Sequence, residues 1–327
     1  MFRYNTLNRD EVKRFEAPLT KNYIEIHLED TSINPSGDPS WKPIPCVMTS
    51  RYRIFAEYIR DLTVYEDDVW IITFPKAGTT WTQEMVWLIH QNLDYERAAA
   101  VNLNDRSVFM ELSAFVNDAN FPDTLGKVEQ MPRPRHIKSH LPLALLPKQL
   151  WTVKPKIVYT ARNPKDVTTS YMHHYKHLHG FQGPREDFLD GILADQLLFC
   201  PQIKHATEFW TISHRPNVLI LHYEDMKRNM PEVLRKVSFF FGKHYTPSQL
   251  AQLEHHLKFD TMKDNDSANN RLLLAGIAMA TGVQSDFRFM RKGQVGSYKD
   301  ELPAEFVDKL DAFVEQQLNG SNFKYRD

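Results

Sequence analysis

Lys76 and Gly78 lie in the stretch TFPKAGTTW, residues 73–81, whose residue types suit the binding of an anion. Gly78 lets the backbone turn and approach a ligand closely. Thr79 and Thr80 begin a helical pattern, where free N–H groups and the helix dipole favour negative charge. Lys76 adds a full positive charge. The stretch predicts a phosphate-binding loop, and the alternative is an ordinary strand-to-helix turn with a capping threonine.

Two further segments carry positive charge beside backbone that can turn. In ARNPKDVTTSY, Arg162 ends a predicted strand and Ser170 lies two turns along the helix that follows. A guanidinium and a hydroxyl in this arrangement can clamp a phosphate, which arginine binds in a bidentate manner. In FRFMRKGQVGSYK, Arg291, Lys292 and Gly293 combine two charges with a flexible backbone. Each segment alone also fits a solvated surface, but with the loop they predict a three-part cradle for a nucleotide.

The stretch RHIKSH, residues 135–140, offers a candidate base. On a strand, His136, Lys138 and His140 share one face because side chains alternate. Histidine titrates near neutrality and suits removal of a proton from a hydroxyl, and lysine can stabilise developing negative charge. The alternative is a histidine on the surface of a short strand.

A second histidine cluster follows Ser170. His173 and His177 are four residues apart in a helical pattern, which is a spacing that metal ligands use. No HExxH glutamate and no cysteine accompany them in this stretch. We therefore expect a helix that flanks a pocket, and no metal.

Short apolar runs alternate with helical patterns along the chain. Strands are expected over residues 68–74, 135–140, 156–161 and 217–226, with helices after the first, third and fourth. This alternation predicts an α/β fold with a central, mostly parallel sheet flanked by helices. Ligands of such sheets bind beyond the carboxyl ends of the strands, so the turns after Phe74, Ala161 and Tyr223 should hold the chemistry. We interpret residues 1–327 as one domain and residues 1–50 as an extended N-terminal segment packed on it.

Composition excludes several classes of partner. The 327 residues are 42% hydrophobic and carry a formal net charge of −1, so a bulk attraction to nucleic acid or to a membrane is not expected. The longest mostly apolar run, residues 272–283, is shorter than the ~20 residues of a membrane span. The two cysteines fit a reducing compartment, and the N-terminal stretch lacks the apolar core of a signal peptide. We expect a cytoplasmic protein.

Four of these elements, in the same order, resemble motifs of the cytosolic sulfotransferases, which use 3′-phosphoadenosine 5′-phosphosulfate (PAPS). FPKAGTTW is similar to their phosphosulfate loop YPKSGTTW, and IKSHLP to K-T-H-L-P, whose histidine is the base. ARNPKDVTTSYMHHY and RKGQVG are similar to their two 3′-phosphate segments. HYEDM and HHLKFDTMK resemble segments beside the adenine. The resemblance covers roughly residues 40–300.

The resemblance implies a P-loop-like phosphosulfate-binding loop, PAPS as the donor and no metal. His140 would accept the proton of the acceptor's hydroxyl in an in-line displacement. Lys76 would stabilise the departing 5′-phosphate and Lys138 the transferred sulfonate, while Ser170 would restrain Lys76 until the acceptor arrives. The implied donor-binding residues are Lys76, Ala77, Gly78, Thr79, Thr80, Trp81, Arg162, Ser170, Tyr223, Leu257, Phe259, Arg291, Lys292 and Gly293.

The chain departs from the family's pattern at several positions. Ala77 replaces the loop serine, so tuned kinetics rather than lost activity are expected. Leu257 and Lys258 replace the threonine and serine of H-T-S-F. The sequence after Gly296 lacks the family's short homodimer motif, so a homodimer is not expected to form in the usual way. Residues 101–134 form a longer segment than in compact vertebrate members and resemble insect members.

Aromatic and apolar residues offer candidate walls for the acceptor. They are Phe109, Phe115, Phe121, Tyr171, Tyr175 and the run 272–283. This run forms either a lid over the acceptor or a buried core helix, because a short apolar run fits both. Such a pocket fits a small hydrophobic phenol, sterol or lipid-like alcohol, as in xenobiotic or steroid metabolism. Phe109, Tyr175, Lys138 and His140 are the expected contacts.

Three other functions remain open at this point. A member of the same family can act as a dehydratase, in which a sulfonated alcohol eliminates sulfate, as in the insect retinol dehydratase. A P-loop kinase would need its lysine after a second glycine and an acidic group for Mg²⁺, for which Glu224 and Asp225 are candidates. A binding protein without activity would keep only the nucleotide cradle.

Overall fold

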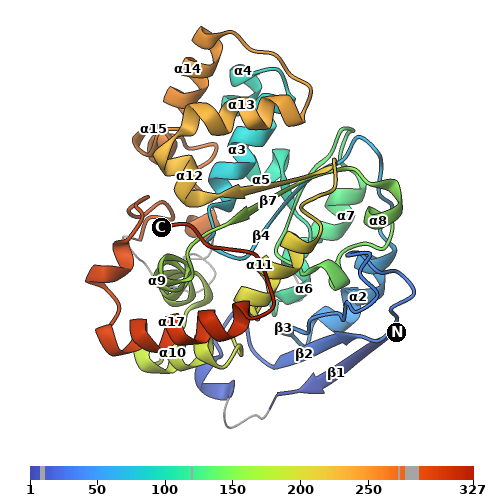
Figure 1. Cartoon of the computed structure of the whole chain (residues 1–327), viewed down its shortest axis with the longest axis vertical. Coiled ribbons are helices and arrows are strands. Elements are labelled where there is room, and N and C mark those ends of the chain that lie inside the picture. The colour runs from blue at the N-terminus through green and yellow to red at the C-terminus, as the bar shows by residue number, and fades with distance from the viewer. Residues whose placement is uncertain (8–11, 119–120, 272, 277–286) are drawn as a thin grey trace.

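A five-stranded parallel sheet lies at the centre of the computed structural model, which describes residues 1–7, 12–118, 121–271, 273–276 and 287–327 (Figure 1). All four pairs of neighbouring strands are parallel. The strands, in their order across the sheet, are β5 (Val108–Phe109), β6 (His136–Ser139), β4 (Val69–Thr73), β7 (Lys156–Ala161) and β8 (Val218–His222). The predicted α/β fold with a parallel sheet is confirmed.

Both faces of the sheet are covered by helices, because alternate residues of each strand point to opposite faces. Trp70 and Ile72 of β4 pack in one core, and Val69 and Ile71 in the other. The first core includes residues of α9 (Pro164–His174), α10 (Arg185–Leu193), α11 (Gln202–Thr211) and α17 (Ala304–Leu318). The second includes residues of α3 (Thr79–His90), α13 (Met230–Phe240), α14 (Pro247–His256) and α15 (Phe259–Asp264). Figure 1 shows these two layers on either side of the strands.

The N-terminal segment forms a small sheet of its own. Its strands are β1 (Phe2–Thr6), β2 (Tyr23–Leu28) and β3 (Cys46–Thr49), and both pairings are antiparallel. Ile24 and Ile26 of β2 belong to the same core as Trp70 of the central sheet. The N-terminal residues therefore pack on the central sheet and share its core.

The remaining helices connect these layers and are mostly short. They are α2 (Tyr52–Asp61), α4 (Tyr95–Ala100), α5 (Leu103–Arg106), α6 (Leu112–Phe115), α7 (Thr124–Glu129), α8 (Leu150–Val153) and α12 (Tyr223–Arg228). Three single turns are η1 (Lys13–Phe15), η2 (Leu143–Leu145) and η4 (Ser297–Asp300), and η3 (Tyr175–His179) is a π-helical turn at the end of α9. The long segment 101–134 thus supplies α5, β5, α6 and α7.

One predicted boundary is wrong. The strand expected over residues 217–226 ends at His222, and Tyr223 begins α12. Glu224 and Asp225 occupy the first turn of α12, and Lys227 and Arg228 the last turn. These charges complement the helix dipole, and the apolar run that favours a strand ends before them. Tyr223 therefore lies at the start of a helix rather than within the strand.

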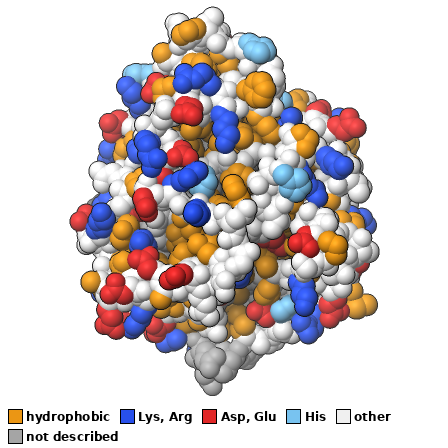
Figure 2. Space-filling model, viewed as in Figure 1, with side chains coloured by type: hydrophobic (Ala, Val, Ile, Leu, Met, Phe, Trp, Pro, Cys, Tyr) orange, Lys and Arg blue, Asp and Glu red, His pale blue; other side chains and the backbone are white. Residues whose placement is uncertain are grey.

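The surface carries mixed charge. On the face of Figure 2, Lys and Arg side chains are interspersed with Asp and Glu, as a net charge of −1 leads one to expect. Among the described residues, no helix is long and apolar enough to cross a membrane. The apolar run 272–283 lies mostly outside the described residues, and only residues 273–276 of it are described.

Candidate active site

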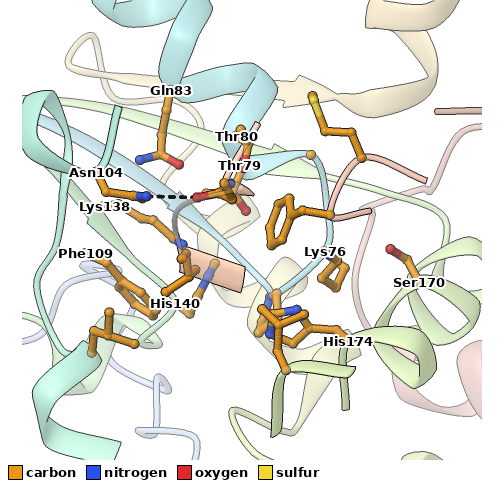
Figure 3. A pocket seen from close by; sticks show the side chains of 18 of the residues that line it. Lys76, Thr79, Thr80, Gln83, Asn104, Phe109, Lys138, His140, Ser170 and His174 are labelled. Atoms are coloured by element: carbon orange, nitrogen blue, oxygen red, sulfur yellow. Dashed lines mark hydrogen bonds between the residues drawn. The ribbon is translucent and has the colours of Figure 1, made fainter. Parts of the chain in front are cut away.

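A cavity of about 680 Å³ opens beyond the carboxyl ends of β4, β6, β7 and β8 (Figure 3). Most of the residues singled out in the sequence line it. They are Lys76, Gly78, Thr79, Thr80, Trp81, Phe109, Phe115, Phe121, Lys138, His140, Arg162, Ser170, Tyr171, Tyr223, Leu257, Phe259, Arg291, Lys292 and Gly293. Ala77 and Tyr175 do not line it and are buried in the core instead.

Gly78 shapes the loop between β4 and α3. It is the N-cap of α3, with a φ of 99° in the left-handed region that favours glycine. A Cβ at this position would lie 2.7 Å from Cδ2 of Tyr223, so the backbone and that ring touch closely. Lys76 also has a positive φ, of 66°. The free N–H groups of Thr79 and Thr80 follow at the start of a twelve-residue helix, which is a favourable place for an anion.

Lys76 lies partly buried among other cations. Its Nζ stands 3.8 Å from the centre of the Phe289 ring. Burial, and then the charges of Lys138, Arg162 and Arg291, lower the pKa of Lys76 to about 7. An anion bound beside Lys76 would oppose this shift and favour the protonated ammonium.

His140 is held in one tautomer by the end of β4. Its Nδ1 lies 2.7 Å from the backbone carbonyl of Thr73, which can only accept, so Nδ1 carries the proton and Nε2 keeps its lone pair. The rings of Phe109 and Phe199 contact the imidazole edge-on, at centroid distances of 4.9 and 5.4 Å. Burial and then the charge of Lys138 hold the pKa of His140 well below its usual range. The imidazole is therefore a neutral proton acceptor that faces the cavity.

Glu111 holds the backbone of His140 in place through a hydrogen bond, and the sequence analysis did not single it out. Its Oε1 accepts hydrogen bonds from the backbone N–H of His140 at 2.6 Å and from Oγ of Ser139 at 3.1 Å. The carboxyl is fully buried, and burial raises its pKa to about 7. Glu111 and His140 are brought together by tertiary packing, because they lie 29 residues apart in the sequence. No spacing of residues in a motif would therefore have predicted this contact.

Lys138 and His140 line the cavity together, whereas His136 does not. The Nζ of Lys138 lies 4.0 Å from the centre of the Phe109 ring. Burial lowers the pKa of Lys138 to about 8, although the charge of Glu111 opposes this shift. The ring of His136 instead hydrogen-bonds that of His90 at 3.1 Å, beneath α3.

Arg162 joins three segments at the far side of the cavity. Its Nη1 donates to the carbonyl of Lys76 and its Nη2 to the carbonyl of Gln294, both at 3.1 Å. The guanidinium lies over the Tyr223 ring at 4.1 Å. Its Nε is buried and has no hydrogen-bond partner among the described residues, so one charged donor remains for a ligand. Ser170, two turns along α9, lines the same part of the cavity.

The aromatic residues expected beside an adenine lie together. Trp81 and Tyr223 meet edge-on at a centroid distance of 5.5 Å. The indole Nε1 of Trp81 donates to the backbone carbonyl of Leu257 at 2.8 Å, so this position acts through its main chain whatever its side chain. Phe259 packs on Gly293, where a Cβ would lie 2.1 Å from the ring. Leu257, which stands where the family has threonine, therefore still accepts the hydrogen bond from Trp81, because that bond goes to its main chain.

Arg291 and Lys292 both form ion pairs with the same carboxylate. Glu301, which sequence reasoning did not single out, lies 2.5 Å from Arg291 Nη1 and 2.6 Å from Lys292 Nζ. The same carboxylate lies 2.6 Å from Nε2 of His173. Among the described residues, no group of three or more His, Cys, Asp or Glu side chains could hold a metal ion. The pair His173 and His177 has parallel rings 6.3 Å apart, and the first of them contacts a carboxylate.

The part of the cavity that Phe109 and Phe115 line also contains two histidines, His174 and His179. His179 accepts or donates a hydrogen bond at Nδ1 with Thr20 at 3.1 Å. His174 has no hydrogen-bond partner for Nδ1 among the described residues, and it meets His179 edge-on at 4.9 Å. Burial keeps the pKa of both imidazoles below the usual range, to about 3 for His179. Figure 3 shows His174 on the same helix as Ser170, and both residues line the cavity with Lys76.

Tyr175 was expected as an acceptor contact, and the structure places it outside the cavity. Its hydroxyl accepts from the backbone N–H of Leu198 at 2.7 Å and hydrogen-bonds the hydroxyl of Tyr23 at 3.2 Å. The residue begins the π-helical turn η3 and packs in the core beside Tyr171.

Glu224 and Asp225 are both engaged within the protein. Oε1 of Glu224 accepts from the backbone N–H of Asn163 at 2.8 Å, and Asp225 pairs with Arg228 and Arg326. Neither carboxylate lines the cavity. The acidic pair therefore stabilises local structure at the start of α9 and along α12.

The fold and the site together define a class of enzyme that transfers an anionic group from a nucleotide. A parallel α/β sheet places an anion-binding loop, a neutral histidine and two separate sets of cations around one cavity. A family model described as a sulfotransferase domain matches residues 66–322.

Curated relatives agree over most of the chain. The luciferin sulfotransferase of Photinus pyralis is 33% identical over 335 residues, which cover 97% of this chain and 86% of that protein. Sulfotransferase 1A1 of Mus musculus is 32% identical over 295 residues, which cover 88% of this chain and 99% of that protein. The chain belongs to the sulfotransferase family and is a transferase.

Solved structures extend the likeness to the whole fold. Retinol dehydratase in complex with androsterone and the inactive cofactor PAP matches with a TM-score of 0.85 and 25% identity, covering 99% of this chain and 98% of that chain. Retinol dehydratase in a complex with retinol and PAP matches with a TM-score of 0.83 and 25% identity, covering 99% of each chain. The resemblance seen in the sequence motifs is thus confirmed at the level of family and fold.

Proposed function

We propose that this enzyme transfers a sulfonate from PAPS to the hydroxyl of a small hydrophobic acceptor, with His140 as the general base. The observation that carries the proposal is the bond from His140 Nδ1 to the Thr73 carbonyl at 2.7 Å. It leaves Nε2 as a proton acceptor in a cavity that also holds Lys76 and Lys138.

The residues around the cavity fit the donor. The buried Nε of Arg162 lacks a hydrogen-bond partner among the residues that the structure describes, and a bound anion can accept from it. The same anion would oppose the lowering of the Lys76 pKa. The loop N–H groups and Lys76 would hold the 5′ end. The 3′-phosphate would be held by Arg162, Ser170, Arg291, Lys292 and Gly293, and the adenine by Trp81, Tyr223, Phe259 and the main chain of Leu257. Bound PAPS supplies an activated sulfonate whose leaving group is a nucleotide 5′-phosphate.

The chain's own residues then do four things. His140 Nε2 takes the proton of the acceptor hydroxyl, and the Thr73 carbonyl stabilises the imidazolium that results. Lys76 and Lys138 place positive charge where negative charge develops on the reacting groups. Ser170 lines the cavity with Lys76 and would restrain its ammonium before the acceptor binds. Phe109 and Phe199 exclude water from the imidazole.

The acceptor proposal rests on the aromatic wall. Phe109, Phe115 and Phe199 contact one another, and Phe109 and Phe199 also contact His140, which suits a flat or ring-shaped apolar alcohol. The imidazole of His174, whose Nδ1 has no hydrogen-bond partner within the part of the chain that the structure describes, suits an acceptor with one further uncharged polar group. Phenols, sterols and lipid-like alcohols meet this description. One relative is named a luciferin sulfotransferase, and the two matching retinol dehydratase structures are complexes with androsterone and with retinol.

Dehydration of the acceptor is a second candidate outcome, favoured by the structural match to retinol dehydratase over 99% of this chain. The mass of the product separates the two outcomes, since transfer adds a sulfonate and dehydration removes water. A cytoplasmic location and a single domain over residues 1–327 remain predictions, and a homodimer remains an open possibility for which the family's usual dimer motif is not recognisable.

The donor is tested by calorimetry without metal. Adenosine 3′,5′-bisphosphate (PAP) should bind and ATP should not, and Arg162→Ala should weaken PAP binding by tenfold or more, because a charged hydrogen bond contributes about 1.5–3 kcal/mol. Wild type is then incubated with PAPS and a panel of phenols, sterols and retinol, with mass detection. Preferred binding of ATP with Mg²⁺, or PAP binding with no product from any acceptor, would contradict the proposal.

A further inference from the structure

Glu301 brings negative charge to one end of the nucleotide cavity. Its Oε1 is shared by Arg291 and Lys292, and its Oε2 contacts His173. Arg291 and Lys292 themselves line the cavity. The side chain of Glu301 is only 16% exposed, so water weakens these ion pairs less than it weakens pairs on the surface.

The position of Glu301 is fixed by the helix that carries Ser170. Asp166 of α9 accepts hydrogen bonds from the backbone N–H groups of Gly296 at 2.8 Å and Tyr298 at 3.3 Å. The backbone N–H of Glu301 donates in turn to the carbonyl of Tyr298 at 3.1 Å. The turn η4 is therefore tied to α9, and the carboxylate is held beside the cations rather than drawn to them by chance.

Burial alone would raise the pKa of Glu301. Hydrogen bonds from Lys292, His173 and Arg291 outweigh it and lower the pKa to about 2. The carboxylate is charged throughout the neutral range and offsets about one of the two positive charges that Arg291 and Lys292 bring to the cavity.

We propose that Glu301 is an internal counter-ion that competes with the nucleotide's 3′-phosphate for Arg291 and Lys292, and so weakens the binding of the product PAP. The proposal rests on the proposed use of a 3′-phosphorylated nucleotide.

Competition follows from the geometry of the shared oxygen. One carboxylate oxygen takes a donor from each of the two cations, at 2.5 and 2.6 Å. A phosphate bound by the same donors must either displace the Glu301 oxygen or lie close to its negative charge. Both the lost ion pairs and the repulsion between like charges lower the affinity for the phosphate. Arg162 is separate, since its Nη groups bond main-chain carbonyls and its Nε has no partner in the described parts of the chain. Glu301 therefore acts on only part of the phosphate site.

This arrangement has a consequence for turnover. When the product leaves, the ion pairs of Glu301 with Arg291 and Lys292 form again and stabilise the empty site. The free energy needed to release PAP is therefore smaller. Product release limits turnover in many enzymes, and where it does so here, weaker binding of PAP raises kcat. The same carboxylate acts on PAPS, which shares the 3′-phosphate.

The test compares Glu301→Gln with wild type by calorimetry, using PAP and 5′-AMP, which lacks the 3′-phosphate. Glu305→Gln is the matched control, because Glu305 has the same charge but pairs only with the exposed Lys309 among the described residues. We expect Glu301→Gln to tighten PAP binding about tenfold and to leave 5′-AMP binding within twofold. The rate constant of PAP release, followed by indole fluorescence, should fall by a similar factor.

Retained 5′-AMP binding shows that the variant is folded, and Glu301→Ala serves as a second variant with the same expected direction. Weaker PAP binding in both variants would overturn the proposal and make Glu301 a residue that positions the cations. An equal change for PAP and 5′-AMP would also overturn it. If wild type does not distinguish PAP from 5′-AMP, the proposed donor itself is wrong, which is a separate result.

Discussion

Binding of a nucleotide phosphate beside Lys76 should take up a proton from solution. The pKa of Lys76 is lowered to about 7 by burial and by the charges of Lys138, Arg162 and Arg291. At pH 8 only about a tenth of this lysine is then protonated in the empty site. A bound phosphate restores the pKa toward the ordinary value of about 10.4, so Lys76 should gain about 0.9 proton.

Calorimetry measures this uptake directly. The enthalpy of PAP binding is determined at pH 8 in two buffers of different ionisation enthalpy, and the slope gives the number of protons. Phosphates with a second pKa near 6 are already ionised at pH 8 and contribute little. Lys138, whose pKa is lowered to about 8, contributes up to about half a proton if it also senses the phosphate.

The variant Lys76→Arg isolates the lysine, because arginine stays protonated and keeps the charge. We expect the uptake to fall by about 0.9 proton in this variant, and by at most about half a proton in Lys138→Arg. The sign follows from the direction of the shift: a lowered pKa in the empty site means uptake on binding, largest above pH 7 and small below it. Absence of uptake in wild type, or an unchanged value in Lys76→Arg, would refute the reasoning.

Three other outcomes are expected. Gly78→Ala should weaken PAP binding about tenfold, because the added Cβ would lie 2.7 Å from the Tyr223 ring. The control is Gly242→Ala, which is also at positive φ but has no atom within 4 Å of the added Cβ. It should cost about 1 kcal/mol of stability and leave PAP binding unchanged. His174→Phe should lower kcat/KM about fivefold for androsterone relative to the same steroid without its ketone, and an unchanged ratio would show that the imidazole does not contact the acceptor. Arg106→Met should destabilise the fold by about 3 kcal/mol or more in urea unfolding, because it leaves Glu84 buried without this partner, and Glu84→Gln in the same chain should recover part of the loss.

The central fold could be predicted because its signals are local. The β-branched run at β4, the turn at Gly78 and the helical spacing after Thr79 each fix a short stretch of backbone. The strand end at His222 was missed, because the charges that favour α12 are a weaker signal than the apolar run before them. The antiparallel N-terminal sheet was also missed, since its pairing joins residues far apart in the sequence.

The site was predicted where chemistry is carried by residues inside a motif. Lys76, His140 and Arg162 each lie at a strand end, and parallel strands bring those ends to one edge of the sheet. Glu111 and Glu301 could not be found in this way, because each acts through a partner on another element. These two carboxylates depend on tertiary packing, which spacing along a chain does not reveal.

The most direct measurement compares single-turnover sulfonate transfer from PAPS by wild type and His140→Ala, with the best acceptor of the panel. PAP binding is measured in both proteins. Loss of a general base should slow transfer by about 10²- to 10⁴-fold, while PAP binding stays within twofold. Transfer at the wild-type rate by the variant would contradict the role of His140, and loss of PAP binding would show that this histidine serves the donor site instead.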